Sequence, residues 1–245
     1  MSANVENNDD RGGILSIKTI GLLGGMSWES TQTYYRLLNE NVKSALGGLH
    51  SARVILYSVD FAEIETLQHQ GNWEETAQIL TAAACAVEAA GADVLLIGTN
   101  TMHKVAPQIE AAIAIPLLHI ADATARVLLN DQVHRVGLLG TRFTMEQAFY
   151  RERLEALGID VLIPDDAQRE IVHRVIYEEL CQGVISAASK EQYLAVVEDL
   201  SRRGAQGVIM GCTEIGLLIQ QTDTAIPLYD TTHIHAAQAV DFALA

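Results

Sequence analysis

The sequence has few cysteines and no long apolar run. Its three cysteines, Cys85, Cys181 and Cys212, have no metal-ligand spacing, and any disulfide scheme leaves one of them unpaired. A reducing, cytoplasmic location is the simplest setting for such a chain. No apolar segment approaches the length of a transmembrane helix, and residues 1–16 lack the basic and apolar regions of a signal peptide. We expect residues 1–17 to form a disordered leader.

Basic residues are also scarce. Lysine and arginine total 16 against 31 acidic residues, which gives a net charge of −15, and the acidic residues are spread along the chain. This balance argues against nucleic acid and anionic membrane surfaces as partners. A small anionic metabolite stays compatible with it, because binding needs only a local pocket of N–H groups and one basic side chain. The hydrophobic content of 49% is enough for a core in one compact body or in two small domains.

Common cofactor and metal motifs are missing as well. The Gly24-Gly25-Met26-Ser27 turn follows a predicted buried strand, but it has neither the lysine of a phosphate loop nor the spacing of a dinucleotide fingerprint. Glu178 and Glu179 belong to no HExxH or DxD pattern, and His233 and His235 have no carboxylate at ligand spacing. We therefore expect no metal site.

An internal repeat organises the chain. Three pairs of segments recur in the same order and with nearly the same spacing: 20–24 with 136–140, 91–99 with 204–212, and 114–117 with 225–228. We infer two similar α/β lobes, residues 18–120 and 121–229, each built on a small parallel sheet. A final helix over 230–245 can pack back on the first lobe. The binding site is expected where the carboxyl ends of the strands face one another.

The repeat aligns Thr99 with Cys212. Cys212 follows an apolar run and precedes Thr213 and Glu214, which open a predicted helix. Free N–H groups and the helix dipole would favour the thiolate there and bring the pKa of the thiol towards neutrality. The alternative is a buried cysteine that packs as a small hydrophobic residue, and position alone does not separate the two.

Other polar side chains follow the predicted strands of both halves. Asn100 and Thr101 come after the third strand, and Thr141 and Thr144 come after the first strand of the second half. Such residues are ordinary helix caps, and they also suit a substrate carboxylate bound at a helix N-terminus. His103, one turn further on, is either a site residue or a packing histidine.

From Lys18 onward the chain resembles the cofactor-independent aspartate/glutamate racemase superfamily, and most closely its aspartate racemase branch. The resemblance lies in five motifs: Gly-Gly-Met at 24–26, Asn-Thr-Met-His at 100–103, Leu-Leu-Gly-Thr-Arg-Phe-Thr at 138–144, Gly-Cys-Thr-Glu at 211–214, and Asp-Thr-Thr with His at 230–235. It implies two pseudo-symmetric flavodoxin-like lobes, each with a central parallel sheet flanked by helices, and usually a homodimer. It also implies racemisation of a small amino acid without a cofactor, by two cysteines that act as acid and base.

Carried over to this chain, the resemblance makes Cys212 the main acid/base. The residues that it implies around the substrate are Met26, Asn100, Thr101, Thr141, Thr144 and Thr213, with Arg53 on the distal carboxylate. Thr99 stands where members that read Cys-Asn-Thr have the second cysteine, and the internal repeat selects the same position; an alignment with Cys-x-Asn-Thr would place that cysteine on Gly98. Threonine is a much weaker acid than a thiol, so we expect asymmetric activity on the two enantiomers.

The activity predicted from the sequence is racemisation of aspartate or glutamate by Cys212 and Thr99. Cys181 lies near the position of a lysine in dicarboxylate-specific members, which weakens the case for aspartate. Three alternatives stay open: a broad-specificity racemase, a dicarboxylate isomerase with a nucleophilic cysteine, and an amino-acid-binding protein with weakened catalysis.

Overall fold

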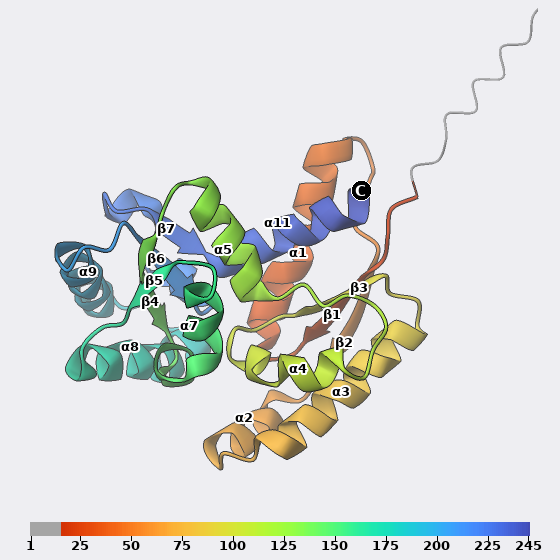
Figure 1. Ribbon diagram of the computed structural model, residues 1–245, viewed down its shortest axis with the longest axis horizontal. Coiled ribbons are helices and arrows are strands. Elements are labelled where there is room, and N and C mark those ends of the chain that lie inside the picture. Colours follow the sequence, from red (N-terminus) through yellow and green to blue (C-terminus); the bar gives the residue numbers. More distant parts are fainter. Residues whose placement is uncertain (1–15) are drawn as a thin grey trace, which may run out of the picture.

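The computed structural model describes residues 16–245, so residues 1–15 of the predicted leader lie outside the described residues. Two lobes, each with its own parallel sheet, make up the molecule (Figure 1). The first sheet has the strand order β2-β1-β3. The elements of this lobe are β1 (Ile20–Gly24), α1 (Trp28–Leu46), β2 (Val54–Ser58), α2 (Phe61–His69), α3 (Trp73–Ala89), β3 (Val94–Ile97), the 3₁₀ helix η1 (Thr101–Val105) and α4 (Ala106–Glu110).

The second sheet has the strand order β5-β4-β6-β7, again with all strands parallel. Its elements are α5 (Ile120–Asn130), β4 (Arg135–Gly140), α6 (Arg142–Glu146), α7 (Ala148–Glu155), β5 (Asp160–Leu162), α8 (Asp166–Glu178), η2 (Leu180–Gln182), α9 (Ala187–Arg202), β6 (Gly207–Gly211), α10 (Ile215–Leu218), η3 (Gln221–Asp223), β7 (Leu228–Asp230) and α11 (Thr231–Leu244). The predicted fold of two α/β lobes is confirmed.

The repeated Gly-Leu-Leu-Gly strands are explained by helix packing. Both strands are buried apart from Arg135 at the start of β4, and the first glycine of each repeat faces a helix at close range. A Cβ on Gly21 would overlap Val87 of α3, and a Cβ on Gly137 would lie 2.7 Å from Leu200 Cδ1 of α9. Glycine therefore lets the helix approach the strand in each lobe.

Helix α11 joins the two lobes. It begins directly after β7 of the second lobe. The side chain of Asp230 caps its N-terminus by accepting hydrogen bonds from the backbone N–H groups of Thr232 and His233. The helix then crosses to the first lobe, where its alanines pack in one buried cluster with Tyr34 and Leu38 of α1 (Figure 1). Helix α5 packs on the second sheet and also contacts α11. The contact between α5 and α11 therefore adds to the connection that α11 itself makes between the lobes.

The structure differs from the predicted elements at two connections. The sequence pattern of residues 116–120 predicts a short strand, but these residues make only one parallel bridge, between Leu117 and Leu95, and α5 already begins at Ile120. Helix α2 was not predicted; it begins at Phe61, after Asp60, whose side chain caps it. The helix buries Ile64, Leu67 and Gln68. Within residues 16–245, we find no helix with the length and apolar character needed to cross a membrane.

Candidate active site

The carboxyl ends of strands in both lobes border one small cavity of about 40 Å³. Thr99 follows β3 and Cys212 follows β6, so equivalent points of the repeat supply the two side chains. A cavity of this size holds a few water molecules at most. A free amino acid therefore enters only when the side chains or the lobes around the cavity move.

Most of the residues expected at the site line this cavity. Seven of the nine do so: Met26, Thr99, Asn100, Thr101, Thr141, Cys212 and Thr213. They come from both lobes, as expected for a site between two facing sheets. Thr144 and Arg53 are the two that do not line it.

Thr144 lies directly behind the cavity wall in a cluster of three threonine hydroxyls. Thr101 Oγ1 of the first lobe is 3.1 Å from Thr141 Oγ1 and 3.4 Å from Thr144 Oγ1 of the second lobe. Thr141 also caps α6 through the backbone N–H of Thr144. Three rotatable hydroxyls at one point can turn their O–H bonds towards an anionic group such as a carboxylate.

Arg53 is far from this arrangement, and its expected contact with the distal carboxylate is wrong. It precedes β2 at the amino end of the strand, whereas the cavity lies at the carboxyl ends. Its exposed guanidinium donates to the backbone carbonyl of Ile17. In a parallel sheet these two ends are separated by the length of the strand, so Arg53 lies at the end of the sheet opposite to the cavity.

Asn100 presents an unused acceptor. Thr231 Oγ1 donates to the carbonyl of Met210 at 3.0 Å, so it must accept from the amide of Asn100, whose Nδ2 lies 3.0 Å away. This chain fixes the orientation of the Asn100 amide. Its Oδ1 atom is buried and has no hydrogen-bond partner among the residues that the structure describes. A buried carbonyl oxygen beside the cavity is suited to accept from a substrate ammonium group.

Cys212 is paired with a carboxylate that the sequence interpretation had treated only as part of a helix start. Cys212 Sγ donates to Glu214 Oε2 at 2.9 Å, and the same oxygen accepts from Thr213 Oγ1 at 2.7 Å. The other oxygen, Oε1, accepts from Ser27 Oγ of the first lobe at 2.8 Å. Glu214 is 7% exposed. The motif signal that points to it is an acidic residue two positions after the thiol, in the same tight turn.

The expected lowering of the Cys212 pKa is also wrong. Helix α10 begins only at Ile215 and has four residues, so it offers little dipole at Cys212. Burial raises the pKa of the Cys212 thiol well above its ordinary value, and the negative charge of Glu214 raises it further. The resting group is therefore a thiol hydrogen-bonded to a carboxylate.

The remaining wall comes from α2 and from the α8–η2 segment. Gln68 of α2 donates to Tyr177 OH of α8 at 3.0 Å, across the two lobes. Phe61, Ile176 and Cys181 complete this wall. Burial raises the pKa of Cys181 to about 12, so this side of the cavity is uncharged. Sequence reasoning missed Gln68 and Phe61 because it did not identify α2.

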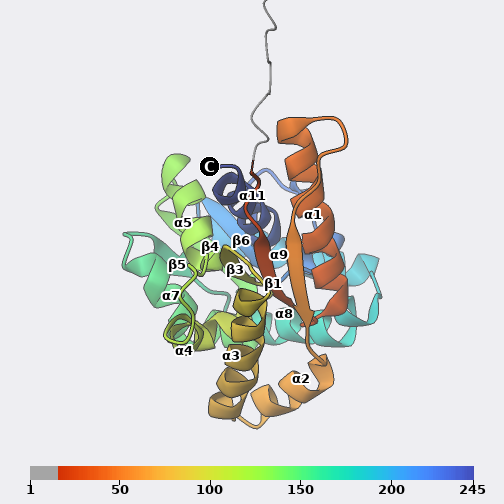
Figure 2. The ribbon, with the colours of Figure 1, turned by 90° about the vertical axis from the view of Figure 1, so that its right-hand side faces the viewer.

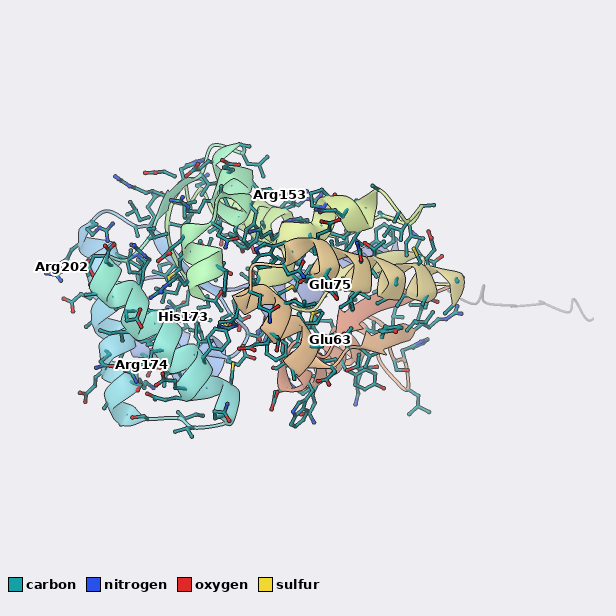
Figure 3. All side chains as sticks on the ribbon, turned by 90° about the horizontal axis from the view of Figure 1, so that it is seen from below. Glu63, Glu75, Arg153, His173, Arg174 and Arg202 are labelled. Atoms are coloured by element: carbon teal, nitrogen blue, oxygen red, sulfur yellow. The ribbon has the colours of Figure 1, made fainter. Side chains whose placement is uncertain are left out.

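Aromatic side chains cover the outside of this wall. Phe143 contacts His69 and Trp73 edge to face, and His173 packs against Tyr177. In Figure 3, viewed from below, His173 on α8 lies where this helix faces α2 and α3 of the other lobe. These contacts join the two lobes over the cavity.

Three histidines lie buried behind Thr99: His103, His119 and His235. The rings of His103 and His119 are 4.4 Å apart, and those of His103 and His235 are 5.9 Å apart. Burial lowers the pKa of His235 to about 4 and, together with Arg153 and His235, that of His119 to about 3. Burial also holds the pKa of His103 well below its ordinary value.

These pKa shifts predict a loss of stability in mild acid. Below about pH 6.5 the histidines become protonated in the unfolded chain but stay neutral in the folded protein. The free energy of unfolding should therefore fall by about 1.4 kcal/mol for each histidine with every pH unit below this value. Chemical denaturation at pH 7, 6 and 5 measures this slope. His119→Asn keeps a side chain able to cap α5 and should flatten it. The matched change at exposed His50 should leave it unaltered, and equal slopes for both variants would contradict the prediction.

Among the residues that the structure describes, no group of three or more His, Cys, Asp or Glu side chains is arranged to hold a metal ion.

Comparisons with known proteins agree with this geometry. The sequence profile of the family described as Asp/Glu/Hydantoin racemase matches residues 23–239. A solved structure from Yersinia pestis, described as a candidate Asp/Glu racemase, is 57% identical, covers 94% of this chain and all of its own, and superposes with a TM-score of 0.89. An aspartate racemase homologue from Pyrococcus horikoshii OT3 is 35% identical over 93% of this chain and 99% of its own, with a TM-score of 0.82. The broad specificity amino-acid racemase RacX of Bacillus subtilis is 22% identical over 92% of this chain and 98% of its own.

Proposed function

The chain belongs to the Asp/Glu/Hydantoin racemase family and is an amino-acid racemase, and we propose that it works without pyridoxal phosphate, with Cys212 and Thr99 on opposite faces of the α-carbon. The observation that carries this proposal is that the two side chains line one small cavity from equivalent strand ends of the two lobes. Within residues 16–245, no lysine lines the cavity, which argues against a Schiff base with pyridoxal phosphate there.

Glu214 supplies the base strength that Cys212 lacks at rest. The thiol passes its proton along the 2.9 Å hydrogen bond to Glu214, and the resulting thiolate removes the α-proton of the substrate. The excess electron pair moves into the substrate carboxylate, which becomes an enediolate. The hydroxyls of Thr101 and Thr141 are positioned to stabilise that charge by donating hydrogen bonds.

Thr99 acts on the opposite face as the acid. Its hydroxyl gives a proton to the α-carbon, and the proton held by Glu214 returns through solvent to the threonine oxygen, which restores the resting state. A threonine hydroxyl is a competent donor to a carbanion but a poor base near neutral pH. The enantiomer whose α-hydrogen faces Cys212 therefore exchanges this hydrogen with solvent faster than the other enantiomer does. We call it the Cys212-facing enantiomer.

The cavity favours amino acids with uncharged side chains over aspartate and glutamate. Phe61, Ile176 and Cys181 are apolar or neutral, and Gln68 is neutral. Among residues 16–245, the one carboxylate on the wall is that of Glu214, and no lysine or arginine lines it. A distal carboxylate buried there would have no cation to pair with, which is costly. Gln68 and the Tyr177 hydroxyl can still hydrogen-bond a polar substrate side chain.

A lysine at position 181 should shift this preference. We expect Cys181→Lys to raise kcat/KM for aspartate relative to a neutral amino acid by about tenfold or more, because the ammonium gives the distal carboxylate a charged hydrogen-bond partner. Cys181→Met is the matched neutral control of similar length. Initial rates with both substrates measure the ratio, and an unchanged ratio in the lysine variant would contradict the neutral side-chain pocket.

A homodimer forms part of the same proposal. Trp28 and Tyr35 on α1, and Leu56 and Tyr57 on β2, are 43–64% exposed, and β2 is an edge strand. Figure 2 has α1 and β2 on the same side of the molecule. An exposed apolar edge of this kind suits pairing with a second copy.

Light scattering tests the dimer. We expect a molar mass of twice the 26.6 kDa of one chain, and Tyr35→Glu should lower it to the monomer value. Leu157→Glu changes a comparably exposed residue of the other lobe and should have no effect. A wild-type monomer would refute this part.

Exchange of the α-hydrogen for deuterium tests the racemase reaction itself. Both enantiomers of a neutral amino acid and of aspartate are incubated with the enzyme in D₂O, without added cofactor, and deuterium at the α-carbon is followed by NMR. We expect exchange in at least one enantiomer, with inverted product carrying one deuterium. A ligand that raises the Tm but never exchanges would favour an amino-acid-binding protein instead.

A further inference from the structure

The three buried histidines connect the Thr99 turn to residues 118–120, which join the two lobes and which we call the interlobe segment. His103 lies on η1, four residues after Thr99; His119 caps α5; and His235 lies on α11. His235 Nε2 is 2.7 Å from the carbonyl of Leu118, and its Nδ1 is 2.8 Å from Tyr34 OH. The histidine layer thus spans the first lobe, the interlobe segment and the terminal helix.

The hydrogen bonds of His103 fix its tautomer. The backbone N–H of Ile120 donates to His103 Nε2 at 3.2 Å, so this nitrogen carries no proton. His103 Nδ1 lies 2.8 Å from the backbone carbonyl of Thr99 and must therefore be the protonated nitrogen that donates to it. The backbone N–H of His103 donates to the backbone carbonyl of Asn100. The carbonyl of Thr99 is thus held by the imidazole.

We propose that His103 is a positioning residue for Thr99: its Nδ1–H holds the Thr99 backbone so that the hydroxyl faces the α-carbon, while Nε2 ties this turn to the interlobe segment. This inference rests on the proposed function, in which Thr99 delivers the second proton. A donor on a flexible turn loses efficiency when it moves by a fraction of an ångström. His103 does not line the cavity, so its effect passes through Thr99.

Of the three buried histidines, His103 is the one that is hydrogen-bonded to the Thr99 turn. His119 Nδ1 accepts from the backbone N–H of Ala121, and His235 is engaged with Leu118 and Tyr34. Neither has a hydrogen bond to the Thr99 turn. His103 is also 2% exposed, so its imidazole is held away from solvent.

Two substitutions separate the two nitrogens of the ring. In His103→Asn, the amide nitrogen stands at the same number of bonds from the backbone as Nδ1 and keeps the donor to Thr99. In His103→Gln, the side-chain oxygen reaches the Nε2 position and keeps the acceptor for Ile120, but the donor to Thr99 is lost. The measurement is the partition of the Cys212-facing enantiomer in D₂O between exchange with retention, which needs Cys212 and Glu214 but not Thr99, and inversion, which also needs Thr99.

We expect His103→Gln to lower the ratio of inversion to retained exchange about tenfold, and His103→Asn to keep it within about twofold of wild type. A purely structural role would lower both processes together and leave the ratio unchanged, which overturns the proposal. Equal ratios in the two variants also overturn it. If wild type shows no exchange, or Thr99→Ala keeps the wild-type ratio, the proposed function fails rather than the role of His103.

Nitrogen-15 NMR of the wild-type enzyme gives a second readout that needs no variant to fold. The His103 imidazole should be neutral and protonated on Nδ1. Protonation on Nε2 would overturn the assignment.

Discussion

Replacing Cys212 by alanine is expected to lower the rate of α-deuterium exchange of the Cys212-facing enantiomer roughly 10³-fold, because the substitution removes the only base assigned to that face. Cys212→Ser should be nearly as impaired. A serine hydroxyl can keep the hydrogen bond to Glu214, but it is a much weaker acid than the thiol and forms too little anion.

The control for this experiment is Cys85→Ala. Cys85 is another half-buried thiol, and it lies outside the cavity, where its sulfur contacts the carbonyl of Ala112. We expect its variant to exchange at the wild-type rate. If Cys212→Ala kept more than about a tenth of the wild-type rate while remaining folded, Cys212 would not be the base.

The second large effect is expected at Glu214. Glu214→Gln should lower the exchange of the Cys212-facing enantiomer about 10²-fold at pH 7, because the thiol loses the neighbouring group that takes its proton. The direction of the pH dependence follows from the same pair. Without the carboxylate, solvent hydroxide must remove the proton, so the rate of the variant should rise about tenfold per pH unit until the thiol is ionised.

Removing the negative charge of Glu214 also removes one cause of the raised Cys212 pKa. The exchange rate of the variant should therefore stop rising at a lower pH than it would if the thiol still lay beside a carboxylate. Glu178→Gln, at an exposed position on α8, is the matched control and should follow the wild-type profile. A Glu214→Gln variant with a wild-type rate and pH profile would show that Glu214 takes no part in proton transfer.

The sequence was sufficient to predict the fold because the repeat is visible in its strands. Gly21 and Gly137 recur for a steric reason, the close approach of α3 and α9, and so the same pattern marks both lobes. The same registration predicted that Thr99 and Cys212 would lie at equivalent strand ends, and both line the cavity.

The predictions failed where the outcome depends on contacts between lobes or on the length of a short helix. The lowered pKa predicted for Cys212 requires a long helix after Thr213, but α10 has only four residues. Arg53 was assigned from the resemblance, without regard to which end of β2 it occupies. The roles of Glu214 and Gln68 depend on Ser27 and Tyr177 of the opposite lobe, and local sequence patterns do not reveal such partners.

The most direct test of the central claim is a crystal structure of the Cys212→Ala variant with a bound amino-acid substrate. The account predicts that the α-carbon lies between Thr99 Oγ1 and the side chain at position 212, with these two groups on opposite faces of the substrate and its ammonium group near Asn100 Oδ1. A substrate with both groups on the same face of its α-carbon, or bound outside the space between them, would contradict the account.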